Sequence, residues 1–318
     1  MTASASRSGV GSDVLCPACG SAEVRTLGEL DVSPGAVVAS TGTRLLSCES
    51  CGLAFRFADD STDGLLASYA ALGGKHWSGG ARPDHRLVAA IVKERSPSGA
   101  VLDVGCWEGD LLVSLGPRSQ KFGLEPSHAA AQIAGTRGVT LLGPTLDSLA
   151  GSSRRFDVVT MIDVIEHVPD PVGALRCAAR LLRPEGFVVV TTGNRDALTW
   201  KLMPLDYWYY SSDHVTFLSL RWLTWAAARL DMTIATSVRF SHTGGSLWQR
   251  ARDLAAAAVF RCLCPPQASL AARRSGWRAK VIGGRRPWTV HWKDHLLVVL
   301  ERGVIDTLGQ NADQGSHH

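Results

Sequence analysis

The sequence has no apolar run long enough to cross a membrane as a helix. Such a helix needs about 18 consecutive apolar residues, and the longest candidate, LAAAAVF at 254–260, falls far short. The N-terminal residues, MTASASRSGVGSD, lack the apolar core of a secretory signal peptide. We therefore expect a cytoplasmic protein without a membrane span, in which the eight cysteines stay reduced.

The chain also lacks a strong net charge of either sign. Its 33 lysines and arginines exceed its 29 acidic residues by only four. This mild balance argues against a strong electrostatic nucleic-acid binder. One local basic run, 272–288, allows three interpretations: a solvated loop with arginines folded over tryptophans, a site for a phosphate or acidic substrate, or an RNA contact.

The most informative stretch is AVLDVGCWEG at 100–109. An apolar run ends in Asp103, a tight turn carries Gly105 and Gly109, and a second acid, Glu125, ends the next apolar run. Such a strand–loop–helix–strand unit binds a nucleoside, because glycine lets the backbone approach the ligand and the second acid accepts hydrogen bonds from ribose hydroxyls. The spacing D-x-G-x-x-x-G differs from G-x-G-x-x-G, so a pyrophosphate cofactor is the weaker interpretation. A tight turn without any ligand is the remaining alternative.

Strand-like and helical segments alternate after residue 99. Helical spacing marks HRLVAAIVKER, LWQRARDLAAAAVFRCL and DPVGALRCAARLLRPEG, the last closed by Pro-Glu-Gly. This alternation predicts a parallel, doubly wound α/β sheet with ligands at the carboxyl ends of its strands. We expect strands at 100–104, 121–125, 139–142, 156–161, 186–192, 232–240 and 294–301.

Three segments carry a family resemblance. LDVGCWEG, GLEPS and FDVVTMIDVIEHVPDP resemble the class I S-adenosylmethionine-dependent methyltransferases in order and spacing. They are most similar to the EHVPDP branch, which includes ubiquinone-type O-methyltransferases and many natural-product and sugar methyltransferases. The resemblance covers roughly residues 85–302. It implies S-adenosyl-L-methionine as cofactor and a Rossmann-like, seven-stranded sheet whose last strand is antiparallel, which DHLLVVLER fits.

The resemblance also assigns a cofactor site. Asp103 and Gly105 would line the methionine end, Glu125 would hold the ribose, and Leu146 would flank the adenine. A bulky Trp107 stands where many members have glycine, so its side chain must point away from the cofactor or help to cover it. The full expected set is Asp103, Gly105, Trp107, Gly109, Glu125, Leu146, Ile162 and Asp163.

Two C-x-x-C-G units lie near the N-terminus. Cys16, Cys19, Cys48 and Cys51 supply four thiolates, which in a reducing compartment suits a tetrahedral zinc ion. Four cysteines leave no open coordination position, so the zinc should be structural. A redox dithiol or a chance occurrence is the alternative. The remaining cysteines, Cys106, Cys177, Cys262 and Cys264, lack paired spacing, and we expect them to be buried apolar residues.

A zinc ribbon before this core resembles the deoxysugar C-methyltransferases. Those proteins use a tyrosine in a segment comparable to SYAALGGKHW, so the resemblance makes Tyr69 a candidate substrate residue. The likeness favours a sugar-like acceptor without settling the reaction. We divide the chain into a zinc-ribbon module (1–60), a helical linker or lid (61–98), a methyltransferase domain (99–302) with an insertion (241–293) before the last strand, and a disordered tail (303–318).

Methyl transfer to a hydroxyl benefits from a general base with a pKa near neutrality, and histidine suits this best. His214 lies in PLDYWYYSSDHVTFLS, the segment that tends to cap the acceptor site in this fold; it is either the base or a residue that pins the loop. His167, in the EHVPDP segment, is either a second candidate base or a scaffold residue. The aromatic residues beside His214 could stack on a sugar ring or simply pack a lid.

These observations lead to one preferred function. We expect O-methylation of a hydroxyl on a sugar or a sugar-bearing small molecule, without a catalytic metal. Carbon methylation of a ketosugar is the runner-up. An RNA methyltransferase is less favoured, because IDVIEH stands where Asn/Asp-Pro-Pro-Tyr/Phe would mark nucleobase amino methylation. A non-catalytic binding protein is least favoured. The oligomeric state stays open, with a homodimer as one candidate.

Overall fold

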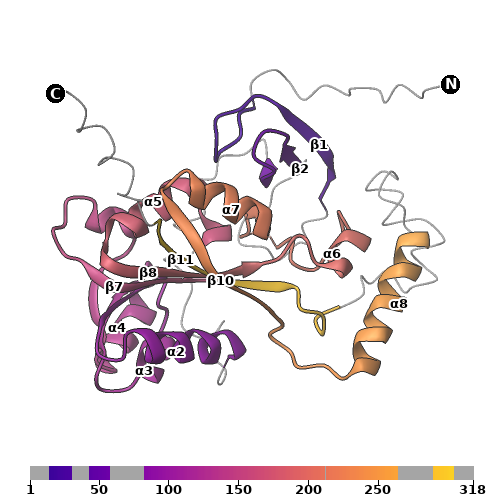
Figure 1. The fold of residues 1–318 in the computed structure, drawn as a ribbon. Helices are drawn as coiled ribbons and strands as arrows, with labels where there is room; N and C mark the ends of the chain where they lie inside the picture. Colours follow the sequence, from indigo (N-terminus) through magenta and orange to yellow (C-terminus); the bar gives the residue numbers. More distant parts are fainter. Residues whose placement is uncertain (1–13, 31–42, 58–81, 212, 264–288, 304–318) are drawn as a thin grey trace, which may run out of the picture.

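The computed structural model describes residues 14–30, 43–57, 82–211, 213–263 and 289–303 (Figure 1). The predictions for Tyr69, for the linker before residue 82, for Cys264, for the basic run 272–288 and for the tail after residue 303 lie outside these residues. No helix within the described ranges is long and apolar enough to span a membrane.

A seven-stranded sheet forms the centre of the molecule, in the order β10-β11-β8-β7-β4-β5-β6. Its inner strands run parallel, and β11 is antiparallel to both β8 and β10. All seven expected strands are present, and the expected antiparallel strand is confirmed. Their bounds are β4 Ala100–Val104, β5 Gln120–Leu124, β6 Thr140–Gly143, β7 Phe156–Ile162, β8 Leu182–Gly193, β10 Met232–Phe240 and β11 His295–Arg302.

Helices cover both faces of this sheet (Figure 1). One buried cluster joins the sheet to α2 (Pro83–Arg95), α3 (Asp110–Ser114) and α4 (His128–Thr136). A second cluster joins the other face to α5 (Pro171–Arg180) and α7 (Leu220–Ala228). Every residue of β4 is buried, as expected for a central parallel strand covered on both sides.

The helix after β7 is shorter than the sequence predicts. It begins as expected, where the Asp170 side chain accepts a hydrogen bond from the Gly173 amide at 2.8 Å, but it ends at Arg180. Leu182 already pairs with Phe156 of β7, so the Pro-Glu-Gly segment at 184–186 lies inside β8, beside a register shift. The expectation that the helix continues to the Pro-Glu-Gly stop signal was wrong, because strand pairing with β7 outweighed the local helical spacing.

The N-terminal module forms a separate sheet in the order β1-β2-β3-β9. Strand β1 (Val24–Glu29) lies between the two cysteine pairs and is followed by β2 (Arg44–Cys48) and β3 (Ala54–Phe57). The fourth strand, β9 (Thr216–Phe217), comes from within the methyltransferase domain and was not expected.

Three further elements complete the described chain. The 3₁₀ turns η1 (Leu146–Leu149) and η2 (Ile165–His167) follow β6 and β7. Helix α6 (Leu198–Leu202) follows β8, and α8 (Leu247–Leu263) packs beside α6 at the edge of the molecule (Figure 1).

Candidate functional site

The glycine turn after β4 is sterically enforced. Gly105 has φ 70° and Gly109 has φ 79°, in the left-handed region that favours glycine. A Cβ on Gly105 would lie 2.7 Å from Val164 Cγ2, and one on Gly109 would lie 2.9 Å from Val139 Cγ2. The turn therefore exposes backbone at the carboxyl end of β4 and has no room for a larger residue.

Trp107 occupies this turn in an uncommon backbone conformation. Its φ of 48° is left-handed, as expected at a position where resembling proteins carry glycine. Its amide donates a hydrogen bond to Glu125 Oε2 at 2.8 Å. Its indole Nε1 is buried and has no hydrogen-bond partner among the described residues. The indole thus adds an unused donor to the turn that the sequence marks for the cofactor.

Glu125 lies directly after β5, where the nucleoside interpretation requires an acid. Its two carboxylate oxygens accept hydrogen bonds from the amides of Trp107 and Ser127, each at 2.8 Å. Burial raises the pKa of Glu125, and the two amide contacts oppose that shift. The side chain is therefore fixed in place and faces the glycine turn.

Asp103 is buried at the end of β4. The Thr160 hydroxyl of β7 donates a hydrogen bond to Asp103 Oδ1 at 2.6 Å. Burial raises the pKa of Asp103 to about 7; the Thr160 hydrogen bond opposes this shift, and the charge of Glu125 adds to it. This carboxyl group thus titrates near neutrality and responds to any cation placed beside it.

Two other members of the expected cofactor set lie at neighbouring positions. Ile162 is the last residue of β7, and Leu146 begins η1 after β6. Both therefore lie at the carboxyl edge of the sheet, Ile162 beside the turn that carries Gly105 and Leu146 beyond β5, after the edge strand β6. The structure thus brings the expected residues to one edge.

Asp163 joins a charged cluster that sequence spacing does not reveal. The Arg82 guanidinium contacts the carboxylates of both Asp84 and Asp163. His242 Nε2 lies 3.5 Å from Asp163 Oδ2, and its Nδ1 lies 3.9 Å from Asp84 Oδ1. Burial would raise the pKa of Asp163, but His242 and Arg82 together hold it well below its usual range.

This cluster could also accommodate a cation. Ligand atoms of Asp84, Asp163 and His242 all lie within 4.8 Å of one another. Arg82 already places a positive charge between the two carboxylates, which lessens the need for a metal. The sequence could not reveal this group, because its members come from α2, the end of β7 and the loop after β10.

His214 is buried in the segment between α6 and β9. Its Nδ1 lies 2.7 Å from the Tyr209 carbonyl oxygen. A carbonyl can only accept, so Nδ1 carries the proton and Nε2 holds the lone pair. Burial, reinforced by the nearby His167, lowers the pKa of His214 to about 4, against the opposing charge of Asp213. The imidazole is therefore neutral at physiological pH.

His167 lies beside His214, with ring centroids 4.6 Å apart. Its Nδ1 contacts the Asp213 carbonyl oxygen at 2.9 Å, which leaves Nε2 as the accepting nitrogen. Its neighbour Glu166 is fully buried, accepts a hydrogen bond from Thr192 Oγ1 at 3.0 Å and contacts the Tyr209 hydroxyl. Sequence reasoning passed over Glu166, whose place in EHVPDP was the available signal.

The aromatic loop after β8 is packed rather than open. Trp200, Tyr207, Tyr209 and Tyr210 are all buried. Trp200 Nε1 donates to the Tyr210 hydroxyl at 2.8 Å, and the Tyr207 hydroxyl donates to Asp294 Oδ2 at 2.7 Å. Of the two interpretations of these aromatic residues, the structure supports lid packing for these four.

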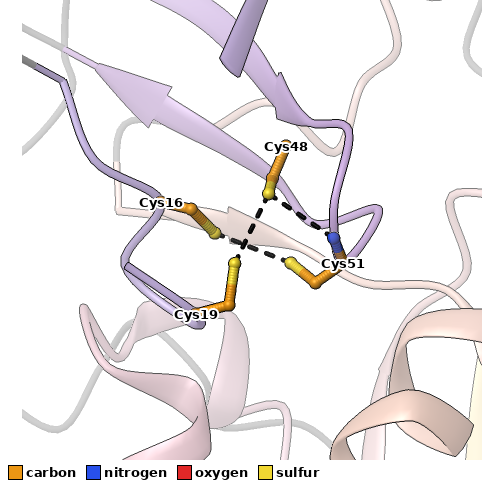
Figure 2. Close-up of side chains that lie close together, drawn as sticks. All are labelled: Cys16, Cys19, Cys48 and Cys51. Atoms are coloured by element: carbon orange, nitrogen blue, oxygen red, sulfur yellow. Dashed lines mark hydrogen bonds between the residues drawn. The ribbon is translucent and has the colours of Figure 1, made fainter. Parts of the chain in front are cut away.

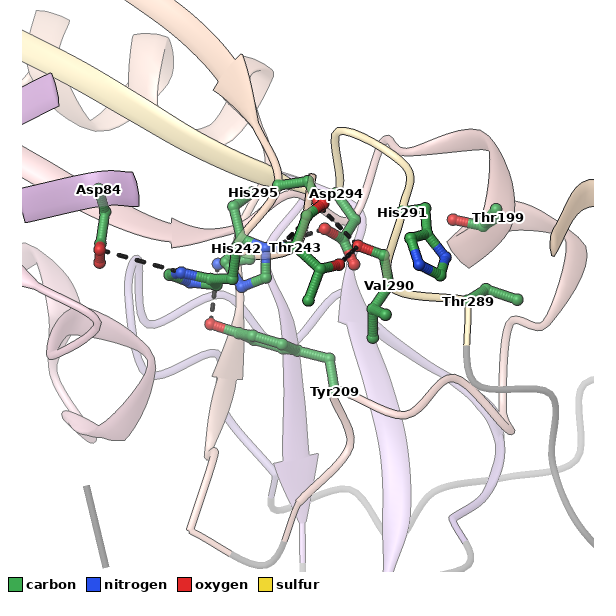
Figure 3. A network of polar contacts seen from close by, with 12 residues as sticks. Asp84, Thr199, Tyr209, His242, Thr243, Thr289, Val290, His291, Asp294 and His295 are labelled. Atoms are coloured by element: carbon green, nitrogen blue, oxygen red, sulfur yellow. Dashed lines mark hydrogen bonds and ion pairs between the residues drawn. The ribbon is translucent and has the colours of Figure 1, made fainter. Parts of the chain in front are cut away.

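Asp294 connects this loop to β11, as Figure 3 shows. It also accepts a hydrogen bond from His295 Nδ1 at 2.9 Å. Burial would lower the pKa of His295, but the Asp294 carboxylate outweighs burial and raises it. The ring of His295 contacts that of His242 at 4.2 Å, so a continuous polar network runs from Asp84 to Asp294.

The four N-terminal cysteines converge as zinc ligands would (Figure 2). All four sulfur atoms lie within 4.8 Å of one another, and the closest pairs are Cys16–Cys51 at 3.6 Å and Cys19–Cys48 at 3.5 Å. A tetrahedral site with Zn–S bonds of about 2.3 Å places its sulfurs roughly 3.8 Å apart. The donor set therefore fits structural zinc.

Two knuckle turns shape this cluster. Gly20 and Gly52 have φ 70° and 79°, as expected for the glycine after each pair, and the Cys51 amide lies 3.5 Å from Cys48 Sγ. Of the cysteines expected to be buried, Cys106 is, whereas Cys262 is exposed on α8, so that prediction was wrong there. Cys262 lies on the outer side of an edge helix, which the sequence could not show.

Comparison with known proteins identifies the core. A family model described as a methyltransferase domain matches residues 80–237. The core is a class I S-adenosylmethionine-dependent methyltransferase domain. This confirms the resemblance found in the sequence.

Similar proteins share this methyltransferase domain over part of their length. A ubiquinone biosynthesis O-methyltransferase of Alkalilimnicola ehrlichii is 38% identical over 30% of this chain and 42% of its own. One of Pectobacterium atrosepticum is 32% identical over 43% of this chain and 64% of its own. The chain thus spans less than two thirds of these relatives.

One solved structure to which the chain is similar is a methyltransferase of Geobacter sulfurreducens in complex with S-adenosyl-L-homocysteine. It is 17% identical, and the similarity covers 74% of this chain and 97% of its own, with a TM-score of 0.45.

Proposed function

We propose that this protein transfers a methyl group from S-adenosylmethionine to a hydroxyl of a sugar or a sugar-bearing small molecule. The observation that carries the proposal is His214: a neutral imidazole with Nδ1 held by a backbone carbonyl and Nε2 unprotonated. The relatives are ubiquinone biosynthesis O-methyltransferases, which supports transfer to oxygen rather than carbon.

The cofactor would be held by residues of the chain that the structure fixes before binding. Glu125 would accept hydrogen bonds from the ribose hydroxyls, and the backbone at Gly105 would face the methionine portion. Arg82 would attract the carboxylate of the cofactor's methionine portion. Asp103 and Asp163 would be the nearby acidic groups that attract the ammonium of that portion. Leu146 and Ile162 would supply apolar contacts, and S-adenosylmethionine would supply the sulfonium-bound methyl group.

His214 would act as the general base. Its Nε2 would accept the hydroxyl proton as the oxygen attacks, and the Tyr209 carbonyl would hold the resulting imidazolium through Nδ1–H. The lowered pKa of His214 keeps the base unprotonated well below pH 7 but makes it weak. We therefore expect proton transfer to accompany methyl transfer rather than to precede it.

A screen of acceptors tests the reaction. We would follow S-adenosylhomocysteine release with nucleotide-sugars, free and lipid-linked glycosides, phenolics and bulk RNA, using wild-type protein and a Glu125→Ala control. Turnover on a glycoside, with product NMR showing an O-methyl group, is the expected result. A C-methyl product would favour the ketosugar alternative, and turnover on RNA alone would contradict the proposal.

The base assignment has its own test. Replacing a general base costs on the order of 10²–10⁴-fold in rate, so His214→Ala should lower kcat by that factor. Cofactor affinity should change little, because His214 lies outside the glycine turn. Near-normal turnover in this variant would overturn the assignment and make His167 the candidate base.

We also propose that transfer needs no divalent metal. Arg82 already places a positive charge between Asp84 and Asp163, two members of a group that could hold a cation. Activity should survive removal of magnesium and manganese under conditions in which measured zinc content stays constant. Loss of activity that magnesium restores would show that a cation binds in this cluster or beside Glu166, His167 and His214.

A further inference from the structure

Strand β9 connects the cysteine module to the acceptor side of the methyltransferase domain. It begins two residues after His214 and pairs with β3, with Phe217 opposite Ala54 and Thr216 opposite Phe55. The Arg56 amide extends this pairing by donating to the Val215 carbonyl at 2.8 Å. The residues that follow His214 are therefore part of the sheet that carries the cysteines.

The segment that contains β9 is also held from the opposite side. The Val215 amide donates to the Glu166 carbonyl at 2.8 Å, and the Thr216 hydroxyl donates to the Ile165 carbonyl at 3.2 Å. The backbone after His214 thus lies between β3 and the EHVPDP segment. Because both sides are hydrogen-bonded, a shift of β3 would displace His214 relative to the sheet edge.

The module and the aromatic loop share one apolar core. Leu30, Leu45 and Ala54 of the module belong to a buried cluster with residues of the loop and of β9: Trp200, Met203, Leu205, Tyr207, Tyr209, Tyr210 and Phe217. Contact is close, because a Cβ added to Gly28 would lie 2.4 Å from Leu205 Cδ1. The module therefore supports the loop whose Tyr209 carbonyl orients His214.

The module has little buried core that is its own. Very small domains often need a metal or disulfides to fold, and the buried apolar residues of this module lie in clusters that it shares with the methyltransferase domain. Cys48 ends β2, and Cys51 precedes β3 by three residues. An ion bound by the four sulfurs would thus fix the two strands that lead to β9.

We propose that the zinc site positions the catalytic loop: zinc bound by the four cysteines orders β3, and β3 holds β9 and with it His214. This role rests on the proposed function of His214. It makes the module a positioning element for the acceptor half of the site. Among the described residues, the cofactor half, built by β4, β5 and their turns, forms no strand pair with β3 or β9. Within this part of the chain, the two halves share only apolar packing in one large buried cluster, so we expect cofactor affinity to depend little on zinc.

The first experiment removes zinc from the full-length protein. A Cys16→Ser/Cys51→Ser variant is compared with wild type and with Cys177→Ser, a cysteine of α5 outside the module. Zinc content, amide hydrogen exchange and S-adenosylhomocysteine affinity are measured. We expect zinc to be lost, exchange at residues 214–217 to rise at least tenfold, and cofactor affinity to stay within about threefold.

A second variant keeps the cysteines and weakens the shared core. Leu45 is fully buried against the aromatic loop, whereas Leu15 of the same module is 57% exposed. Leu45→Ala should retain zinc, raise exchange at 214–217 and lower turnover at least tenfold. Leu15→Ala makes the same chemical change and should match wild type in all three measurements.

These outcomes separate this inference from the proposed function. Unchanged exchange at 214–217 in the zinc-free protein would overturn the positioning role, whatever the activity. Parallel loss of cofactor affinity would also overturn it, because the module would then support the whole domain. If wild-type protein methylates no acceptor, the exchange and affinity measurements still decide the inference, and only the proposed function fails.

Discussion

Asp103 and His214 are both buried, and burial moves their pKa values in opposite directions. It raises that of Asp103 to about 7 and lowers that of His214 to about 4. In each case the neutral form is favoured, since a charge is costly to desolvate. The two groups therefore make opposite contributions to the pH dependence of stability.

The direction of each pH dependence follows from whether the folded or the unfolded chain binds more protons. Between its ordinary value of 3.8 and about 7, folded Asp103 binds more proton than unfolded Asp103, so its contribution to stability falls as pH rises. Between about 4 and its ordinary value of 6.5, unfolded His214 binds more proton, so its contribution falls as pH is lowered.

Urea unfolding from pH 4.5 to 7.5 can separate these contributions. As pH rises, Asp103→Asn should become more stable relative to wild type, whereas His214→Gln should become less stable relative to wild type. Parallel pH dependence in both variants and wild type would show that neither group titrates as described.

Glu125 should control cofactor affinity. A hydrogen bond to a charged group contributes about 1.5–3 kcal/mol, so Glu125→Gln should weaken S-adenosylhomocysteine binding about 10- to 150-fold by calorimetry. Glu185→Gln, at an exposed position in β8, is the matched control and should bind as wild type does. Equal affinity in the two variants would remove Glu125 from the site.

At the scale of elements, the turn between β4 and α3 depends on both backbone conformation and space. Gly105 and Gly116 flank α3, and both have positive φ, at 70° and 89°. A Cβ would clash with Val164 at Gly105, whereas nothing lies within 4 Å at Gly116. The two positions therefore share backbone strain but differ in steric room.

Replacing each glycine with alanine measures the cost of backbone strain and the added cost of steric contact. Backbone strain should cost about 1–3 kcal/mol of unfolding free energy in either variant. Gly105→Ala should lose more unfolding free energy than Gly116→Ala and should also weaken cofactor binding. Adding Val164→Ala to Gly105→Ala should recover part of the extra loss of stability. Chemical denaturation with and without S-adenosylhomocysteine provides the measurement; equal losses would show that the turn can relax.

At the scale of the whole molecule, the carboxyl edge of the sheet is assembled from distant segments of the chain. The proposed cofactor half comes from β4 and β5, and the proposed acceptor half comes from the loop after β8, which packs against the N-terminal module. Ligand that binds only the folded protein stabilises it by about 2.7 kcal/mol at 100 times its Kd.

Saturating S-adenosylhomocysteine should therefore raise the unfolding temperature of wild type by several degrees. Glu125→Gln should need correspondingly more ligand for the same rise, which differential scanning calorimetry can follow. A rise at the same ligand concentration in both proteins would place the binding elsewhere.

Local sequence patterns determined the seven strands of the central sheet, the glycine turn, the acids that follow β4 and β5, and the paired cysteines. Each depends on neighbours within a few residues: alternation along the chain, a left-handed turn, or a knuckle. The EHVPDP segment indicated the methyltransferase family, and the match to the methyltransferase family model confirmed it.

Only the tertiary structure decided the rest. Pairing of Leu182 with β7 ended the helix that local spacing would have continued, and packing buried the aromatic residues that seemed available to a sugar. The charged cluster around Asp163 is formed by residues from distant segments, Arg82, Asp84 and His242. Strand β9 pairs within a sheet whose other strands precede it by some 160 residues or more. Such contacts depend on which surfaces the folded chain brings together, and no local pattern encodes them.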